Sequence, residues 1–408
     1  MASEPFAFII VAVKRLSHIR YVRLYPLAIP LRRPFEHATK KRAVADPVVI
    51  EVELADGTVG YGETLPRPYV SGETVASVLE TIRTWALSEL LGFRPAHFPE
   101  ALEKVDGLPA EDEQGKVATA ARAGLELALL DAYSRHFGKS ISEAVGWLGL
   151  PGLGLPGSRH HVRYSGVLSG GTLRKLKRST RMMRWYGLRD FKLKVGYEDD
   201  VDRVRTVAQV LGRSLGSKTT LRLDANRAWS RQQAIDTVSV LGDIRIVWIE
   251  QPFAASSDDD LVAYKQFVDI DVCHDESLVT MADAERLLRM GVADSFNIRI
   301  SKNGGFLSAL RLAHFARKNG IQYQLGCMVG ETSILSAVGQ RFIENVSGIT
   351  FAEGSYGRFL LADDVVNRPV QFGYGGKIKP LSGLGWGIAV QPAKLETYVT
   401  AGVLEVPL

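Results

Sequence analysis

The chain has 408 residues, of which 46% are hydrophobic and 23% are charged, and this composition excludes a disordered or fibrous protein. Its length exceeds one ordinary domain and suits a barrel of about 250 residues with a second domain. The net charge of +5 is compatible with nucleic-acid binding, but the basic residues between positions 174 and 184 alternate with apolar ones at helical spacing, which indicates a solvated helix face. No zinc-finger or recognition-helix motif accompanies them, so we expect no nucleic-acid partner.

Residues 1–20 are predicted to be an N-terminal extension whose role the sequence leaves open. The apolar run from Pro5 to Val13 is too short to span a bilayer and lacks the features of a signal peptide, so we expect no membrane partner. The two cysteines, Cys273 and Cys327, fall in different predicted strands, which is typical of free thiols in a reducing compartment. We therefore expect a cytoplasmic protein.

Residues 21–150 are predicted to form an α+β domain. Two strands flank the Asp56-Gly57 turn, which is a strong hairpin signal. A helix is predicted over residues 117–138, where apolar residues recur at i, i+3 and i+4 and a glycine ends the pattern. The Gly/Pro-rich segment 149–157 then indicates a linker.

Residues 158–360 alternate strand-like and helix-like segments, which predicts a parallel sheet with helical crossovers. The strand segments are "HVRYSGVL", "FKLKV", "LRLDA", "IVWIE", "DVCHD", "SFNIRI", "IQYQL" and "ITFAE". About eight strands favour a closed (β/α)7β TIM-like barrel of the α/β class. An open doubly wound sheet is the alternative, and no G-x-G-x-x-G or Walker loop supports it.

Charged side chains stand at the ends of these strands, where barrels of this kind place their catalytic groups. In "FKLKVG", Lys192 and Lys194 share one face of the strand because side chains alternate. Lysines on one face also occur on edge strands, which is the alternative explanation. The strand ends that follow carry, in chain order, Asp224, Glu250, Asp275 and Lys302. Charged groups on successive strand ends favour one shared site.

Three carboxylates on neighbouring strands repel one another and need a cation. An oxygen-only set suits Mg²⁺ or Mn²⁺, whereas zinc prefers His or Cys. Each acid alone could instead cap a helix N-terminus, which is the alternative. A metal next to a substrate carboxylate stabilises the enediolate that forms when the neighbouring proton leaves, and an amine crowded by another cation can serve as the base. The pattern therefore predicts proton transfer α to a carboxylate.

The motifs "KLK", "DAN", "EQP", "DES" and "KNGG" resemble those of the enolase superfamily, specifically its muconate-lactonizing-enzyme subgroup. The early hairpin and the 117–138 helix resemble the capping domain of that family, which residues 361–408 would rejoin. The resemblance implies Mg²⁺ ligands at Asp224, Glu250 and Asp275, an acid/base pair at Lys194 and Lys302, an assisting amine at Lys192, and Asn226 beside the metal.

The substrate is less closely defined by this resemblance. Dipeptide epimerases of the subgroup often carry Asp-x-Asp at the eighth strand, whereas "FAEGSYG" has Glu353 there. The loop "GCMVGETS" has one extra residue before Glu331 relative to the family's "GTMLEG"-like loop. We expect both glutamates to contact substrate. Arginines in segments 32–38 and 65–73 are expected either to bind a second substrate carboxylate or to be solvated, and His274 is expected to be a packed histidine.

The sequence thus predicts a metal-dependent enzyme, a muconate-cycloisomerase-like isomerase that acts on a small-molecule carboxylate and assembles as a homo-oligomer. One alternative is a racemase or epimerase of N-acylamino acids or related derivatives, which would need both Lys194 and Lys302. Another is an o-succinylbenzoate-synthase-like dehydration. From a different class, the chain could be a non-catalytic binding protein that kept the barrel.

Overall fold

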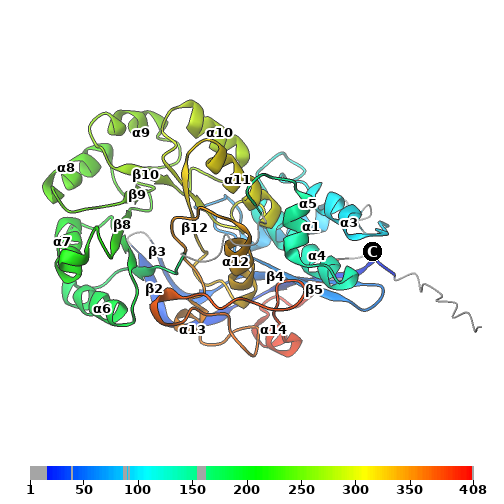
Figure 1. Cartoon of the computed structure of the whole chain (residues 1–408). Coiled ribbons are helices and arrows are strands. Elements are labelled where there is room, and N and C mark those ends of the chain that lie inside the picture. Colours follow the sequence, from blue (N-terminus) through cyan, green and yellow to red (C-terminus); the bar gives the residue numbers. More distant parts are fainter. Residues whose placement is uncertain (1–15, 38–39, 86–89, 91, 154–161, 407–408) are drawn as a thin grey trace, which may run out of the picture.

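The computed structural model of the chain describes residues 16–37, 40–85, 90, 92–153 and 162–406. Figure 1 shows a curled sheet ringed by helices, with a smaller domain of strands and helices packed beside it. The predicted fold class, a TIM-like barrel with an α+β capping domain, is confirmed. Residues 1–15 of the predicted extension and residues 154–157 of the predicted linker lie outside the described residues.

The capping domain is built on an antiparallel sheet with the strand order β13-β1-β4-β5. Its N-terminal elements are β1 (Ile19–Pro26), β2 (Ile29–His37), β3 (Lys40–Ala45), β4 (Val48–Leu54), β5 (Val59–Thr64), α1 (Val75–Thr84), α3 (Phe98–Asp106), α4 (Thr119–Phe137) and α5 (Ile141–Trp147). Strands β2 and β3 form a separate antiparallel pair. The last strand, β13 (Leu404–Val406), pairs with β1, so the C-terminal segment returns to this sheet. Strand β1 begins two residues before the predicted start of the domain.

Helix α4 lies against the sheet because β5 offers two glycines. A Cβ atom at Gly60 or Gly62 would collide with the backbone of α4, so only glycine permits this close approach. The predicted turn between β4 and β5 is present, and Gly57 adopts a φ of 83° there. The helix ends at Gly138 with a φ of 66°, which confirms the predicted stop signal.

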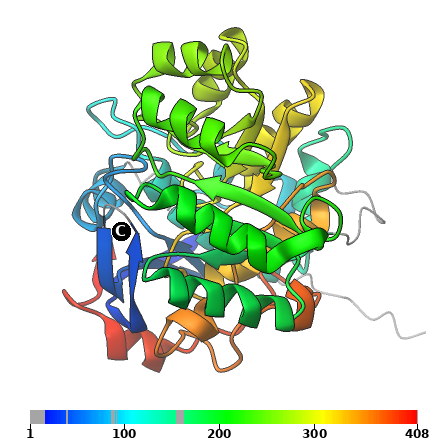
Figure 2. The ribbon, with the colours of Figure 1, turned by 90° about the vertical axis from the view of Figure 1, so that its left-hand side faces the viewer.

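The barrel sheet is parallel, with the strand order β12-β11-β10-β9-β8-β7-β6. Its elements are β6 (Gly166–Leu168), α6 (Leu173–Trp185), β7 (Asp190–Lys194), α7 (Asp200–Leu211), η1 (Gly212–Ser214), β8 (Thr220–Asp224), α8 (Arg231–Leu241), β9 (Trp248–Glu250), α9 (Asp258–Lys265), β10 (Asp271–His274), α10 (Met281–Arg289), β11 (Ser295–Ile298), α11 (Phe306–Lys318), β12 (Gln322–Leu325) and α12 (Ser333–Asn345). Figure 2 views the molecule from the barrel side, where helices lie in front of the strands.

The eighth predicted strand closes the barrel through single bridges. Ala352 forms parallel bridges with Leu325 at the end of β12 and with Tyr164 just before β6. The Ser165 amide donates to the Ala352 carbonyl at 2.8 Å, and the Glu353 amide donates to the Leu325 carbonyl at 2.8 Å. The sheet is therefore closed, and the open-sheet alternative is wrong. Three short helical segments follow, α13 (Gly357–Leu360), η2 (Tyr374–Gly376) and α14 (Pro392–Tyr398).

Two carboxylates of the capping domain cap two helices of the barrel. Glu63 at the end of β5 accepts hydrogen bonds from the Thr332 and Leu335 amides at 2.8 and 2.9 Å, at the start of α12. Glu126 in α4 accepts from the Leu307 amide at 2.9 Å, at the start of α11. A carboxylate at a helix N-terminus satisfies free amides and interacts favourably with the helix dipole. These contacts fix the position of the capping domain on the barrel.

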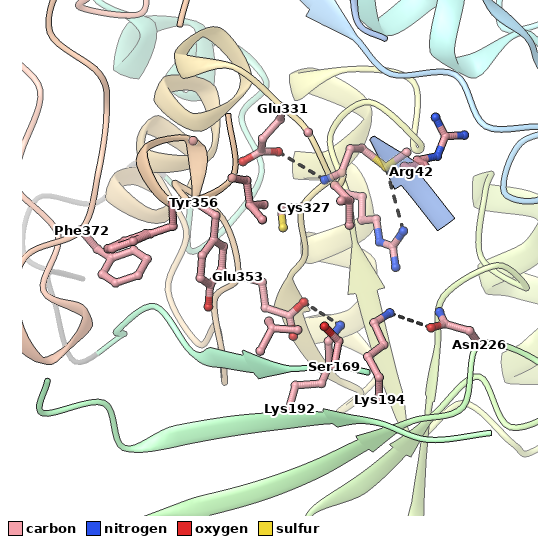
Figure 3. A pocket seen from close by; sticks show the side chains of 18 of the residues that line it. Arg42, Ser169, Lys192, Lys194, Asn226, Cys327, Glu331, Glu353, Tyr356 and Phe372 are labelled. Atoms are coloured by element: carbon pink, nitrogen blue, oxygen red, sulfur yellow. Dashed lines mark hydrogen bonds and ion pairs between the residues drawn. The ribbon is translucent and has the colours of Figure 1, made fainter. Parts of the chain in front are cut away.

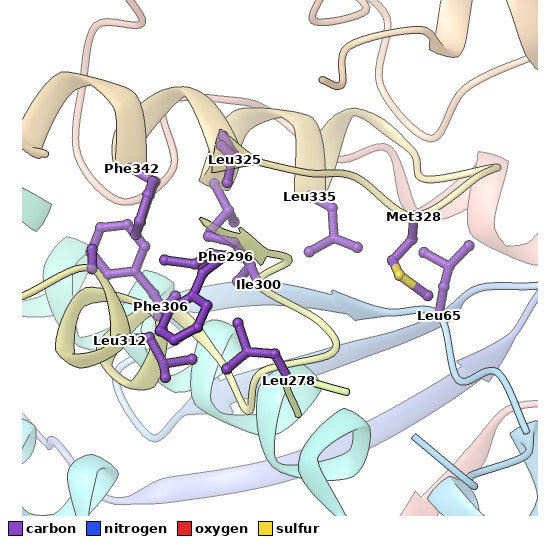
Figure 4. Packing of buried hydrophobic residues seen from close by; sticks show 14 of the residues in the cluster. Leu65, Leu278, Phe296, Ile300, Phe306, Leu312, Leu325, Met328, Leu335 and Phe342 are labelled. Atoms are coloured by element: carbon purple, nitrogen blue, oxygen red, sulfur yellow. The ribbon is translucent and has the colours of Figure 1, made fainter. Parts of the chain in front are cut away.

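One continuous hydrophobic cluster joins the two domains. It contains Leu65, which follows β5, together with barrel residues such as Met328, Leu335 and Phe306 (Figure 4). Among the described residues, no helix is both long enough and apolar enough to cross a bilayer.

Candidate active site

The lysines of β7 point into the barrel. Strand β7 lies between β6 and β8, so the edge-strand explanation is wrong. The register places Lys194 beside Asp224 and places Asp224 beside Glu250, so these side chains form one row across neighbouring strands. Asp275 directly follows β10, the next strand of the sheet. The predicted residues are therefore brought together at one end of the barrel.

The three carboxylates are fully buried and none of them caps a helix. Helices α8, α9 and α10 begin after Ser230, Ser257 and Thr280, so the N-cap alternative is wrong for these acids. The carboxylates instead bind cationic side chains. Oδ2 of Asp224 lies 3.1 Å from the Lys192 ammonium and 2.8 Å from the Lys194 ammonium. Lys192 also lies 3.1 Å from Oε1 of Glu250.

Asp275 is held by two cations from beyond β11. The guanidinium of Arg299 donates to Oδ2 of Asp275, and it lies 3.8 Å from Glu250. The Lys302 ammonium contacts Oδ1 of Asp275 at 3.0 Å and donates to the carbonyl oxygens of Asp275 and Asn297 at 2.7 and 2.8 Å. All three ammonium hydrogens of Lys302 thus have acceptors, and its side chain is 0% exposed.

Burial and neighbouring charge move the pKa values of these groups in opposite directions. Burial raises the pKa of Glu250 to about 8, with a further contribution from the negative charge of Asp224. Burial would also raise the pKa of Asp224, but the charges of Lys194 and Lys192 outweigh it and lower that pKa. The pKa of Lys302 is lowered by burial, against the charge of Asp275. Unequal pKa values among adjacent groups are typical of functional sites.

The donor set is chemically suited to a hard divalent cation. Buried oxygen ligands from three carboxylates are what Mg²⁺ prefers. In the part of the chain that the structure describes, no three acidic, His or Cys side chains stand in a metal-binding arrangement. Ammonium and guanidinium groups lie between the carboxylates. The oxygen Oε2 of Glu276, next to Asp275, is buried without a hydrogen-bond partner. The residues therefore fit Mg²⁺ by the chemistry of their donor atoms.

A cavity of about 400 Å³ opens beside this cluster. Lys192 and Lys194 line it, whereas Lys302 is not among the described residues that do. Figure 3 shows Lys194 directed towards Asn226, whose Oδ1 lies 2.6 Å from the ammonium. Lys302 therefore does not border the cavity in this structure, and its role as the acid/base partner of Lys194 stays a prediction.

Comparison with known proteins identifies the family of this site. The model described as "Enolase C-terminal domain-like" matches residues 175–394, and the model described as "Mandelate racemase / muconate lactonizing enzyme, N-terminal domain" matches residues 20–146. The chain belongs to the enolase superfamily.

Curated relatives and solved structures agree with this assignment. Muconate cycloisomerase 1 of Pseudomonas putida is 30% identical over 344 residues, which are 84% of this chain and 88% of that protein. N-succinyl-L-Arg/Lys racemase of Bacillus cereus is 28% identical over 330 residues, which are 79% and 82% of the two chains. A crystal structure of a dipeptide epimerase from Enterococcus faecalis, complexed with Mg and the dipeptide L-Leu-L-Tyr, matches with a TM-score of 0.77 at 27% identity and covers 91% of this chain and 99% of that one. The predicted class, an isomerase of the enolase superfamily, is confirmed.

Glu331 and Glu353, the two glutamates that are expected to contact substrate, both line the cavity. Glu353 contacts Lys192 at 2.6 Å and Arg222 at 3.2 Å, so it crosses the barrel interior. Glu331 accepts a hydrogen bond from the Met328 amide at 3.2 Å, and burial raises its pKa to about 8. The extra residue in its loop has thus not removed Glu331 from the cavity wall.

Two arginines of the capping domain reach the cavity, and only one lies in the predicted segments. Arg67 is 2% exposed, so the solvated alternative is wrong for it. Arg42 on β3, outside both segments, also lines the cavity, and its Nε atom is buried without a hydrogen-bond partner. Asp46 binds both guanidinium groups, at 2.8 Å from Arg42 and 2.9 Å from Arg67. Arg32 instead is exposed and reaches the Ala362 carbonyl at 3.4 Å.

Gln251 is a further site residue, to which the sequence assigned no role although it stands in the "EQP" motif. Its side-chain oxygen accepts from the Asp275 and Ser277 amides at 3.0 Å each, which ties the end of β9 to the end of β10. Its backbone φ of 38° is rare for a residue other than glycine and marks a constrained position. The predicted packed histidine is confirmed, because His274 is buried and bonds the Val292 carbonyl at 2.8 Å.

Proposed function

We propose that this enzyme abstracts or delivers a proton α to the carboxylate of a small-molecule substrate, in a muconate-cycloisomerase-like reaction with Lys194 as the acid/base. One observation carries the proposal: the Lys194 ammonium lies between Asp224 and the cavity, whereas Lys302 is fully enclosed. Cycloisomerisation needs a proton at only one face of the substrate. A single amine that faces the cavity meets that need.

We assign Asp224, Glu250 and Asp275 as the ligands of Mg²⁺ or Mn²⁺. When bound, the ion supplies positive charge next to the substrate carboxylate and stabilises the negative charge that develops as the proton leaves. The oxygen-only donor set supports this choice, as does the Mg in the matched dipeptide epimerase structure.

The other residues of the site hold and orient the reacting groups. Asn226 accepts from the Lys194 ammonium at 2.6 Å and so directs the amine along the cavity wall. Lys192, between Glu250 and Glu353, keeps a positive charge near the carboxylate row. Arg42 and Arg67 place positive charge at the capping-domain end of the cavity, where a second polar group of the substrate can bind.

A second candidate function is 1,1-proton transfer, as in the racemases and epimerases among the relatives. The order of the strands favours it. Lys194 pairs with Asp224 on one side of Asp275, whereas Lys302 follows β11 and contacts Asp275 from the other side. In this case Lys302 must leave its three acceptors and reach the substrate. We rank 1,1-proton transfer second because it requires this movement of the Lys302 side chain.

Proton NMR in D₂O with Mg²⁺ tests the proposal, using pooled muconates, N-succinylamino acids, dipeptides and other carboxylates. We expect lactone signals or the loss of an α-proton signal. The rate of this change should be at least about 10²-fold lower in Lys194→Met than in the unmodified enzyme. The matched control is Lys218→Met, because Lys218 is exposed on the surface. If the activity of Lys302→Met falls as far as that of Lys194→Met, and the product is the opposite enantiomer of the substrate, the second candidate replaces the first. If no acid in any pool reacts, the non-catalytic binding protein is favoured.

We also propose that the enzyme is cytoplasmic and homo-oligomeric. Both cysteines are free thiols in the structure, which supports a reducing compartment. Trp185 on α6 is 82% exposed, and such an aromatic surface residue supports contact with a second copy. Light scattering coupled to size-exclusion chromatography measures the assembly directly.

A further inference from the structure

The cavity has two chemically unlike ends. One end carries the lysines, Arg42 and Asn226, while the other is built by α6, the turn that follows it and the segments after the last barrel strand. Figure 3 shows Phe372 and Tyr356 on the opposite side of the cavity from Arg42 and Asn226. We call this second end the apolar chamber, and its walls are Met182, Met183, Tyr186, Leu188, Phe359 and Phe372.

The deep wall of the apolar chamber is fixed by aromatic packing. Phe372 is 4% exposed, and its ring centroid lies 5.3 Å from that of Tyr356, 5.7 Å from that of Phe359 and 6.3 Å from that of Tyr186. Rings packed in this way keep their positions without a ligand, so the wall is preformed. No side chain that defines the chamber carries a charge.

The rim of the chamber leaves large apolar side chains in water. Met182 is 59% exposed and Phe359 is 50% exposed, and both line the cavity. Neighbouring exposed apolar groups beside a hollow mark a surface that binds a ligand, because covering them removes apolar area from water. The whole cavity, both ends together, has a volume of about 400 Å³, which lies within the range of about 300–1,000 Å³ that holds a drug-sized ligand.

We propose that the apolar chamber binds an uncharged, bulky apolar group of the substrate, aromatic or branched aliphatic, while its carboxylate lies at the lysine end. This inference rests on the proposed function for the carboxylate end and adds the substrate class. A substituent of this kind fills the chamber, whereas a second carboxylate of the substrate would bind at Arg42 and Arg67, at the other end of the cavity. A carboxylate with one large apolar substituent matches both ends.

Titration calorimetry in the presence of Mg²⁺ tests this with butyrate and 4-phenylbutyrate, which differ only in the phenyl group. We expect 4-phenylbutyrate to bind at least about tenfold more tightly. The double variant Met182→Gln/Phe359→Gln replaces two exposed rim side chains by uncharged polar ones, so folding is preserved. It should lower the affinity for 4-phenylbutyrate about tenfold and change that for butyrate by less than about twofold.

The matched control is Trp185→Gln. Trp185 lies on the same helix as Met182 and is more exposed, at 82%, but it is not among the described residues that line the cavity. It should leave the affinity for both acids unchanged. Size-exclusion chromatography of each variant is run alongside, because a second copy of the chain is the rival occupant of this rim.

Four results would overturn the inference. The first two are equal affinities for the two acids and no binding of 4-phenylbutyrate at millimolar concentration. The third is a loss of affinity in Trp185→Gln as large as that in the rim variant Met182→Gln/Phe359→Gln. The fourth is a rim variant that changes the assembly state and leaves the affinity for 4-phenylbutyrate unchanged. Because calorimetry measures binding without turnover, a failure of the proposed function appears separately, as the absence of proton exchange in an enzyme that still prefers the phenyl acid.

Discussion

Replacing Glu126 by alanine should destabilise the enzyme more than any exposed ion-pair substitution. Its carboxylate is 0% exposed, accepts from the Leu307 amide at 2.9 Å and binds Arg122, which is itself buried. Removing it leaves a guanidinium without its counter-charge and a helix N-terminus without its cap. Breaking a buried pair from one side costs about 3–5 kcal/mol, and losing a cap costs about 1 kcal/mol. Because Arg122 keeps the Leu108 carbonyl as an acceptor at 3.1 Å, we expect a total of about 4 kcal/mol.

The assay is urea unfolding followed by circular dichroism. The matched control is Glu285→Ala, because Glu285 pairs with Arg289 at the same i,i+4 spacing with both side chains at least half exposed, and such a pair contributes less than about 1 kcal/mol. The double variant Arg122→Met/Glu126→Leu should recover part of the loss, since it leaves no charge unpaired. A loss below about 1 kcal/mol in Glu126→Ala, or a loss equal to that of the control, would refute the reasoning.

Two further predictions concern the contact between the domains. Burial raises the pKa of Glu63 to about 7 and that of Glu331 to about 8, so in this range the folded state binds more protons than the unfolded state, and stability should fall as pH rises from about 4.5 to 8. Thermal unfolding of Glu63→Gln should show a shallower pH slope, and an unchanged slope would contradict this. Gly305→Ala should be more destabilising than Gly57→Ala in the same assay. The backbone φ is positive at both sites, but only at Gly305 would an added Cβ collide with another side chain, that of Glu126. Equal losses of stability in the two variants would contradict the steric account.

The strand-end residues of the site could be predicted because they follow local rules. Alternation along β7 places Lys192 and Lys194 on one face, and the spacing of the βα units places Asp224 and Glu250 in the same row as these lysines. Neither deduction needs knowledge of distant contacts. The helix stop at Gly138 and the turn at Gly57 are likewise local, since each depends on one residue with positive φ.

The partners of these residues could not be predicted because they come from packing between distant segments. Arg299 reaches Asp275 across neighbouring strands, and the sequence gives no sign of which acid it binds. Arg42 lines the cavity only because the β2–β3 pair folds over the barrel mouth, and the enclosure of Lys302 depends on carbonyl acceptors from two segments. One signal was available for Arg299, which stands three residues before Lys302 at a strand end.

The capping domain is attached to the barrel at two points close to the site. Glu126 fixes the start of α11, which follows Lys302, and Glu63 fixes the start of α12 just after Glu331. These two attachments hold parts of the barrel that line or support the site. A rigid joint at these points keeps the carboxylate row aligned with the cavity. The β2–β3 pair, which carries Arg42, belongs to a separate two-stranded sheet and has neither of these anchors. The β2–β3 pair is instead attached to the segment after the barrel, through the Leu31–Leu361 bridge and the Ala362 amide, which donates to the Pro30 carbonyl at 2.8 Å. Arg42 and the carboxylate row are thus held in place by different parts of the chain.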